Sequence, residues 1–309
     1  MEEDAQNSEA RIAEVVREAV QKAFSLSPRS YAPGGQPTPE TLFQSRRAAA
    51  LKQEIILTGR KLWQRSYVDG NGGNLSARLT DDLILCTPTL VSKGDLTPED
   101  IGLVDLNNAL VCGDRPQTSE ILLHLEIYKA IPQARAVVHC HPPYATAHAI
   151  AGVTPPQHLL PEQEVFVGPI AISPYHTPGT AEFARSILPY VHQHRVILLA
   201  NHGLVSWADT PTHAEWAVEI LETYCQTAHL ARQLNPNFNA IPPAEITKLL
   251  DVKRQLGIPD PRFTEQPTPA AEDRNPPGPI PVEELVQSLT RQILAYAAAH
   301  LNSEPGVRR

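Results

Sequence analysis

The sequence predicts a mixed α/β domain, because short buried-strand patterns alternate with long amphipathic helices. Residues 136–138 and 196–200 are apolar runs rich in β-branched residues, and both are short enough to be buried strands. Residues 40–66 and 212–234 carry apolar side chains at helical spacing. Residues 68–112 alternate short apolar runs with turn residues, which is typical of an antiparallel meander.

The elements between these anchors follow from local signals. A helix is predicted to begin near residues 117–120, because Thr118 or Ser119 can cap its free amides. A helix through residues 146–151 follows the strand at 136–138. The apolar run at 165–172 is predicted to be a further strand with a bend at Gly168.

Composition limits the class of protein. The chain has 309 residues, 42% of them hydrophobic, and a net charge of −8, which argues against general binding to nucleic acid or to a membrane surface. The four cysteines form no CxxC pair, which favours reduced thiols. The acidic N-terminus lacks the apolar core of a signal peptide, and no run of 18 apolar residues occurs. We therefore expect a cytoplasmic protein.

The chain is predicted to have three parts. Residues 1–39 form an N-terminal helical appendage, and residues 40–234 form the main domain. Residues 235–309 form a Pro-rich linker and a C-terminal helical extension, since seven prolines fall between Pro261 and Pro281 and an amphipathic helix pattern follows.

Two histidines end the strand near residue 140. Alternate residues of a strand point to the same face, so His139 and His141 project together and Cys140 projects to the other side. Pro142 then ends the strand, because proline cannot donate to the ladder. Two converging imidazoles can form half of a metal site.

His202, which follows the strand at 196–200, is the candidate third ligand. Three protein nitrogens leave an open position for substrate, the pattern of a catalytic zinc site. Glu120 is the candidate fourth group, as ligand, base or both in turn, although a first-turn carboxylate also complements a helix dipole. His192 and His194 are a rival pair that we expect to lie in a solvated loop.

The glycine-rich segment at residues 70–76 has two interpretations. It is either a hairpin turn with Asn-Gly as its signal, or a loop whose exposed amides hold an anion. It is not a Walker loop, because no Gly-Lys-Ser/Thr follows at the required spacing.

Residues 40–234 resemble the class II aldolase/adducin family, which includes L-fuculose-1-phosphate aldolase. The resemblance rests on the order and spacing of six motifs: GNGGNLSAR (70–78), TPTLVSKGDLTPEDI (87–101), TSE (118–120), HCHPPYA (139–145), PYHTPGT (174–180) and NHG (201–203).

The resemblance implies a three-layer α/β/α fold, with a central, mainly antiparallel sheet between helices, and a homotetramer with active sites between subunits. It implies that His139, His141 and His202 bind one divalent metal ion per chain, zinc first, with Mn, Co or Fe as alternatives, and that Glu120 is the catalytic acid/base. Substrate-binding roles fall to four residues: Asn74, Thr89, Thr118 and Ser119.

The expected function is a metal-dependent lyase of carbohydrate metabolism. It would cleave a small hydroxy-carbonyl substrate, a sugar or sugar phosphate, by retro-aldol chemistry through a metal-bound enediolate. A decarboxylase or dehydratase on the same scaffold is the alternative, and a non-catalytic adducin-like binding domain is the alternative of another class. Leu90 departs from the family's phosphate loop, which often has glycine at this position.

Overall fold

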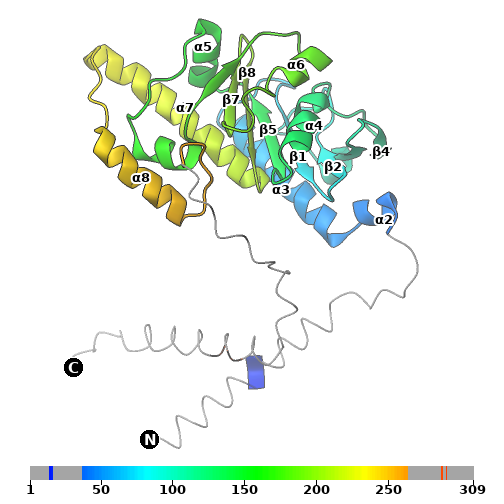
Figure 1. Ribbon diagram of the computed structural model, residues 1–309. Coiled ribbons are helices and arrows are strands. Elements are labelled where there is room, and N and C mark those ends of the chain that lie inside the picture. The colour runs from blue at the N-terminus through cyan, green and yellow to red at the C-terminus, as the bar shows by residue number, and fades with distance from the viewer. Residues whose placement is uncertain (1–13, 17–36, 264–286, 288–289, 291–309) are drawn as a thin grey trace, which may run out of the picture. The chain divides into compact units, whose positions relative to one another are not determined.

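The computed structural model describes residues 14–16, 37–263, 287 and 290 of the chain (Figure 1). Residues 37–264 form one compact unit, so the segment after residue 234 belongs to this unit as far as residue 263 is described. The division of the chain into three functional parts stays a prediction, and the predicted terminal helices lie largely outside the described residues. Within the described residues, no helix is both long and apolar enough to cross a bilayer.

An eight-stranded sheet forms the centre of this unit, in the order β4-β3-β2-β1-β5-β8-β7-β6. All neighbouring strands are antiparallel except β6 and β7, so the mainly antiparallel sheet is confirmed. The strands are β1 (Asn74–Arg78), β2 (Leu83–Cys86), β3 (Gly102–Asp105), β4 (Leu110–Cys112), β5 (Ala136–Cys140), β6 (Ala171–Ser173), β7 (Val196–Leu199) and β8 (Gly203–Ala208).

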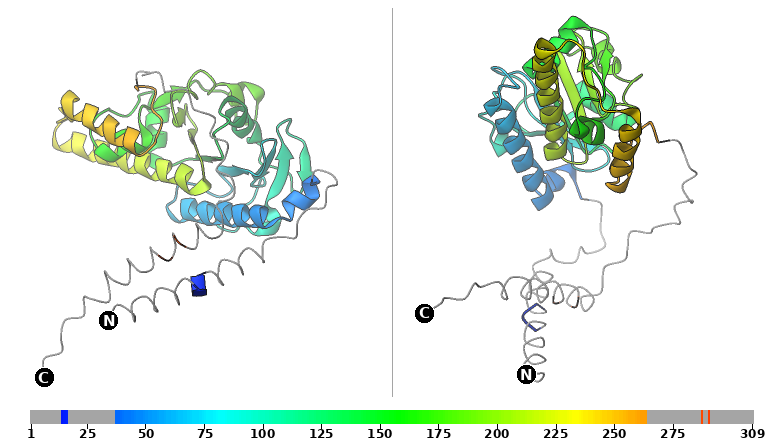
Figure 2. Two further views of the ribbon diagram at one scale, coloured as in Figure 1. Left: turned by 60° about the horizontal axis from the view of Figure 1, so that its bottom comes forward. Right: turned by 90° about the vertical axis from the view of Figure 1, so that its left-hand side faces the viewer.

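Helices cover both faces of the sheet, which gives the expected three layers (Figures 1 and 2). One core joins the sheet to α3 (Arg46–Gln64), α5 (Pro143–Ala151) and α7 (Pro211–Leu234). The other joins it to α4 (Ile121–Ala130) and α6 (Ala181–Arg185). Strand alternation divides β5 between them, since Val138 and Cys140 enter the first core and Val137 enters the second.

The predicted helix at residues 40–66 is two helices in the structure, α2 (Pro39–Phe43) and α3. The break has a local cause, because Ser45 has an extended backbone and its side chain accepts a hydrogen bond from the Ala48 amide at 3.1 Å. This N-cap starts a new helix within a continuous apolar pattern. A 3-10 turn, η1 (Pro98–Asp100), precedes β3.

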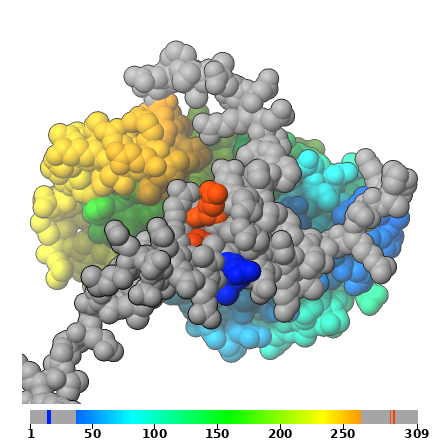
Figure 3. Space-filling view, turned by 90° about the horizontal axis from the view of Figure 1, so that it is seen from below, coloured from blue at the N-terminus to red at the C-terminus, as the bar shows by residue number. Residues whose placement is uncertain are grey.

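The predicted strand at residues 165–172 is wrong over its first half. Residues Gln163–Val167 form a π-helix, η2, and only β6 is extended. Val165 and Val167 are buried in the helical turn, so the apolar side chains of this short run are removed from water although the segment does not pair in the sheet. The helix α8 (Pro243–Gln255) packs beside this turn, and Figure 3 shows α8, in orange, next to α7, in yellow.

Candidate metal centre and active site

Three histidines meet where β5 ends and where β7 turns into β8. His139 pairs with Val205 across β5 and β8, and His202 lies in the turn just before β8. The Nε2 atom of His139 lies 3.1 Å from Nε2 of His141 and 3.2 Å from Nε2 of His202. The structure thus brings together the three side chains that the sequence predicted to converge.

The two glycines beside the triad allow this close approach. Gly73 has φ +67°, and a Cβ there would lie 2.9 Å from the His139 carbonyl oxygen. A Cβ on Gly203 would lie 2.7 Å from Cδ2 of His141 and closer still to the Cys140 carbonyl oxygen. Any side chain at these positions would push the ligand-bearing backbone apart.

The protonation pattern of the triad suits a divalent cation. His139 Nδ1 donates to the Leu204 carbonyl oxygen at 2.8 Å, which leaves a lone pair on Nε2. His141 turns Nδ1 toward the Asp69 carboxylate at 3.5 Å, so its Nε2 is also free of a proton. Two lone pairs 3.1 Å apart repel one another unless a cation lies between them, and tetrahedral ligands at about 2.0–2.1 Å from an ion are separated by about this distance.

The same environment favours the neutral form of His141 and His202. Burial and the neighbouring imidazole of His139 lower the pKa of both His141 and His202 to about 4. The ring of His202 is oriented by stacking on Phe183, with ring centroids 5.4 Å apart. Neutral, oriented imidazoles are the form that binds a metal ion, so these residues can hold one.

Glu120 is the N-cap residue of α4. Its side chain makes no capping hydrogen bond and is directed toward the triad. Its Oε2 lies 3.1 Å from His139 Nε2, and its Oε1 lies 3.4 Å from His202 Nε2. Burial raises the pKa of Glu120, but positive charge at the positions of His139 and His202 and the hydrogen bond from the Asn74 amide outweigh this effect and hold the pKa well below its usual range; a cation bound by these imidazoles would supply the same charge. The side chain is therefore a carboxylate at neutral pH, beside the position that a cation would take.

A buried chain of hydrogen bonds extends from Glu120 into the core. Asn74 Nδ2 donates to Glu120 Oε2 at 2.9 Å, and Asn74 Oδ1 lies 2.6 Å from Nε2 of His124. The Nδ1 atom of His124 lies 2.7 Å from Ser76 Oγ, which lies 2.8 Å from the Tyr128 hydroxyl. Burial lowers the pKa of His124 to about 3, so its ring is neutral.

The chain of bonds has one direction in which every member is satisfied. An amide oxygen can only accept, so His124 Nε2 carries the proton and donates to Asn74. His124 Nδ1 then accepts from Ser76, whose oxygen accepts from Tyr128. Asn74, predicted to bind substrate, is thus also the direct support of the Glu120 carboxylate.

Sequence reasoning missed His124, Ser76 and the hydroxyl of Tyr128. Two periodicities could have found them. Glu120, His124 and Tyr128 are each four residues apart, which places them on one face of a helix, and Ser76 follows Asn74 at the strand period of two. Polar residues at these spacings on otherwise apolar elements indicate a buried network.

The predicted substrate residues lie on two paired segments beside Glu120. Thr118 N donates to the Thr87 carbonyl at 3.0 Å, and Thr89 N donates to the Pro116 carbonyl at 3.2 Å. Thr118 is buried and its hydroxyl accepts weakly from Glu120 N at 3.4 Å, whereas Ser119 is exposed. The structure brings the two segments together beside Glu120, and the substrate-binding roles of Thr89, Thr118 and Ser119 stay predictions.

The glycine-rich loop is not a hairpin turn, because it connects α3 to β1. Lys93, which is 1% exposed, holds this loop against the 87–93 segment by donating to the Asn71 carbonyl at 3.0 Å and the Val91 carbonyl at 2.6 Å. Leu90 at the tip of that segment has φ +58° and is 78% exposed. A leucine in the left-handed region is strained, and such strain is common at ligand-binding loops.

The rival histidines do not gather. His192 is exposed, and His194 Nδ1 bonds to the Pro169 carbonyl oxygen at 2.9 Å. Among residues 37–263, the group of three potential metal ligands found within 4.8 Å of one another is His139, His141 and His202. The metal hypothesis therefore rests on the predicted triad.

Two kinds of enzyme are found among the proteins similar to this chain. A 3-oxo-tetronate 4-phosphate decarboxylase of Cupriavidus necator is 36% identical over 65% of this chain and 94% of that protein. An L-fuculose phosphate aldolase of Methanococcus maripaludis is 38% identical over 59% of this chain and 97% of that protein.

Solved structures agree with this grouping. YgbL of Klebsiella pneumoniae, described as an aldolase, epimerase or decarboxylase, is 29% identical with a TM-score of 0.61, covering 65% of this chain and 98% of that one. An L-fuculose 1-phosphate aldolase is 28% identical with a TM-score of 0.62, covering 67% and 97%. The profile of the Class II Aldolase and Adducin N-terminal domain matches residues 53–229. The chain therefore belongs to the class II aldolase and adducin family.

Proposed function

We propose that the chain is a divalent-metal-dependent lyase that breaks a carbon–carbon bond beside a carbonyl group of a small sugar-like substrate. The observation that carries this proposal is the meeting of three imidazole nitrogens with the Glu120 carboxylate. The names of the similar enzymes support the same class of reaction. A non-catalytic adducin-like role would leave this buried carboxylate and its supporting bonds without a purpose.

Each residue then has a definite task. His139, His141 and His202 would hold the ion, and three nitrogen donors favour zinc. When bound, the ion supplies a Lewis acid that stabilises charge on substrate oxygens by several kcal/mol. The Asn74 amide orients Glu120 through the 2.9 Å bond, and Glu120 moves the proton. Thr89, Thr118 and Ser119 would contact the far end of the substrate.

Two reactions fit this description, decarboxylation of a β-keto acid and aldol cleavage of a ketose phosphate. We favour decarboxylation. The bond to the carboxylate breaks, CO₂ leaves, the electron pair stays on the neighbouring carbon, and one proton returns to that carbon. Aldol cleavage also requires a proton to leave the substrate hydroxyl. Among the described residues, Glu120 is the one carboxylate within 4 Å of the triad's Nε2 atoms, which suits a single proton transfer. Three other residues, Tyr175, His176 and Glu162, could supply a second proton to an aldol cleavage; Tyr175 and Glu162 are exposed and His176 is half-buried.

Aldol cleavage of a ketose phosphate is the second candidate, because the Methanococcus maripaludis aldolase is 38% identical. Glu120 would then act twice, first as base and later as acid. For both reactions we propose a cytoplasmic homotetramer with active sites between subunits, as the resemblance implies. Analytical ultracentrifugation of the purified protein tests the assembly.

The test compares the two substrates directly. The protein is loaded with Zn²⁺ or Mn²⁺ and supplied with 3-oxo-tetronate 4-phosphate or L-fuculose 1-phosphate, and release of CO₂ or of aldehyde is measured. CO₂ release that is lost in Glu120→Gln and in His139→Ala supports the proposal. Turnover by metal-free His139→Ala at the wild-type rate contradicts it, and inactivity on a wider panel of keto acids and ketoses would favour a binding role.

A further inference from the structure

A second cavity lies at the opposite end of β8 from the triad. Its volume is about 670 Å³, within the range of small-molecule sites. Its walls include Phe166, Arg195, Trp207, Trp216, Leu256 and Pro259. Trp207 is five residues beyond His202, and at about 3.3 Å per residue this places the cavity roughly 16 Å from the triad along the strand.

One cationic donor in the cavity wall lacks an acceptor. Arg195 has no hydrogen bond or ion pair from its guanidinium to any described residue, and the group lies over the Trp207 ring at 5.5 Å from the centroid. The indole N–H of Trp207 also lacks an acceptor within residues 37–263, but it is fully buried and is not assigned to the ligand. A guanidinium without a partner in a partly buried site calls for an acceptor from a ligand.

The acidic groups of the same wall are already engaged. Asp209 Oδ1 lies 2.7 Å from His213 Nδ1, and Glu219 Oε1 pairs with Arg65 Nε at 2.7 Å. Burial lowers the pKa of Arg195, a cost that a bound anion would offset. Asp209 lies near enough to act electrostatically on Arg195 but forms no direct ion pair with it, so the guanidinium is the cationic group of the lining that is left for a ligand's carboxylate.

The rest of the lining is aromatic and apolar. Trp216 is 50% exposed, Phe166 is 43% exposed and Leu256 is 56% exposed, so ring faces and an aliphatic side chain are open to a ligand. A guanidinium beside indole faces binds a planar carboxylate and stacks a ring at the same time. A simple inorganic anion would leave these faces in water.

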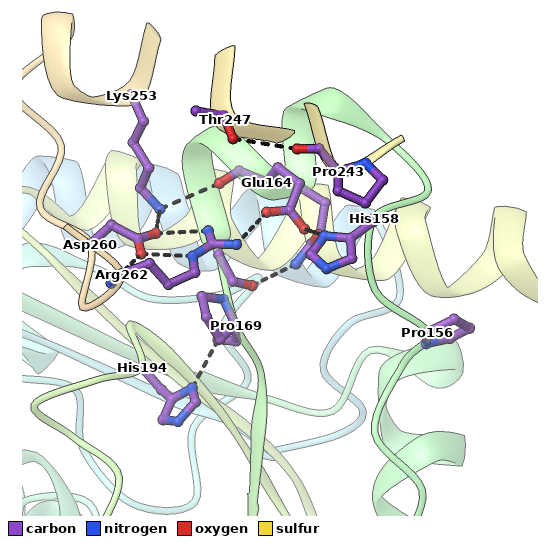
Figure 4. A network of polar contacts seen from close by, with 12 residues as sticks. Pro156, His158, Glu164, Pro169, His194, Pro243, Thr247, Lys253, Asp260 and Arg262 are labelled. Carbon is purple, nitrogen blue, oxygen red and sulfur yellow. Dashed lines mark hydrogen bonds and ion pairs between the residues drawn. The ribbon is translucent and has the colours of Figure 1, made fainter. Parts of the chain in front are cut away.

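A buried ionic network fixes the walls in place (Figure 4). Lys253 Nζ donates to Asp260 Oδ2 at 2.7 Å, and these two residues flank the 256–259 wall on both sides. Arg262 bonds to Asp260 at 2.8 and 2.9 Å and to Glu164 Oε2 at 2.7 Å, two residues before Phe166. His194, next to Arg195, is tied to the Pro169 carbonyl.

We propose that this cavity is a second ligand site, which binds a small aromatic carboxylate between the indole faces and the Arg195 guanidinium. It is distinct from the triad and independent of the proposed reaction. The site is preformed, because its walls are held by the network and not by the ligand.

The tryptophan fluorescence of the protein can report on binding at this site. Three tryptophans are present, so Trp63→Phe leaves only the two that line the cavity. In that background, phenylacetate should change the emission saturably at millimolar concentration. Neutral 2-phenylethanol and ring-free acetate should bind at least tenfold more weakly. Arg195→Gln should weaken phenylacetate at least tenfold, whereas Arg185→Gln, at an exposed arginine of α6, should have no effect.

Three results would overturn the site. The first is phenylacetate binding by both Arg195→Gln and Trp216→Ala that is as strong as in the parent protein. Trp216 is half-exposed, so its truncation should be tolerated by the fold. The second is loss of phenylacetate binding in His139→Ala, which would place the ligand at the triad. The third is tryptophan emission that acrylamide cannot quench, because a second copy of the chain would then cover the cavity.

Discussion

Replacing His124 by leucine isolates the buried network that supports Glu120. The leucine fills much of the imidazole volume but removes both ring nitrogens. Asn74 Oδ1 and Ser76 Oγ then lose their shared partner, and these residues are only 4% and 0% exposed. Water does not reach them, so Asn74 Oδ1 is left without a partner, whereas Ser76 Oγ keeps only its bond to the Tyr128 hydroxyl.

The expected cost follows from the count of stranded groups. A buried polar atom without a partner costs about 1–3 kcal/mol and the lost Ser76 bond about 0.5–1.5 kcal/mol, so the free energy of unfolding should fall by about 1.5–4.5 kcal/mol. The Asn74 amide also loses the bond that fixes its orientation toward Glu120. Turnover should fall roughly 10- to 100-fold, the range for supporting residues of a metal site. Metal content should stay unchanged.

Urea denaturation measures the free energy of unfolding, and steady-state kinetics with elemental analysis give turnover and metal content. Tyr128→Phe is the matched control, because it keeps the buried ring and removes only the last hydroxyl, at about 0.5–1.5 kcal/mol. If His124→Leu is as stable and as active as Tyr128→Phe, the network does not support Glu120 and the directional scheme is wrong.

Three further predictions test other parts of the molecule. Glu120→Gln should keep a metal content within a few-fold of the wild type and lower turnover roughly 10²- to 10⁴-fold. Elemental analysis and steady-state kinetics measure the two quantities, and unchanged turnover would remove Glu120 from the mechanism. Burial raises the pKa of Asp260, but bonds from Arg262 and Lys253 outweigh it and lower the pKa to about 2. The ionised form therefore contributes about 2–3 kcal/mol above roughly pH 4, which is lost as the pH falls toward 2. Asp260→Asn should lack this acid-side loss in urea titrations, and an identical slope would contradict the ion network. Leu90→Gly should be about 1 kcal/mol more stable than Leu90→Ala, because only glycine accepts φ +58° without strain; equal midpoints would refute strain there.

The sheet and the triad could be predicted because they depend on strong local patterns. The apolar runs at 136–138 and 196–200 predict β5 and β7, and strand alternation alone places His139 and Cys140 on opposite faces. The convergence of His202 required knowledge of strand pairing, which the order of motifs supplied. Long, strongly periodic elements such as α7 were equally clear.

What could not be predicted depends on tertiary contacts. The apolar run at 165–167 forms a π-helix because α7 and α8 cover it, and no periodicity in three residues distinguishes this from a strand. The bond between Asn74 and His124 joins residues 50 positions apart. Arg195 and Leu256 meet only through the packing of α8, so the second cavity has no signature in the sequence.

Metal content of the purified protein tests the central claim most directly. We predict about one divalent ion per chain in the wild type after reconstitution, as a three-ligand site requires, and almost none in His139→Ala that still unfolds cooperatively. His194→Ala, in the histidine pair that does not gather, should keep the ion. A wild-type chain that takes up no metal, or a His139→Ala chain that retains it, would contradict the metal centre and the lyase mechanism built on it.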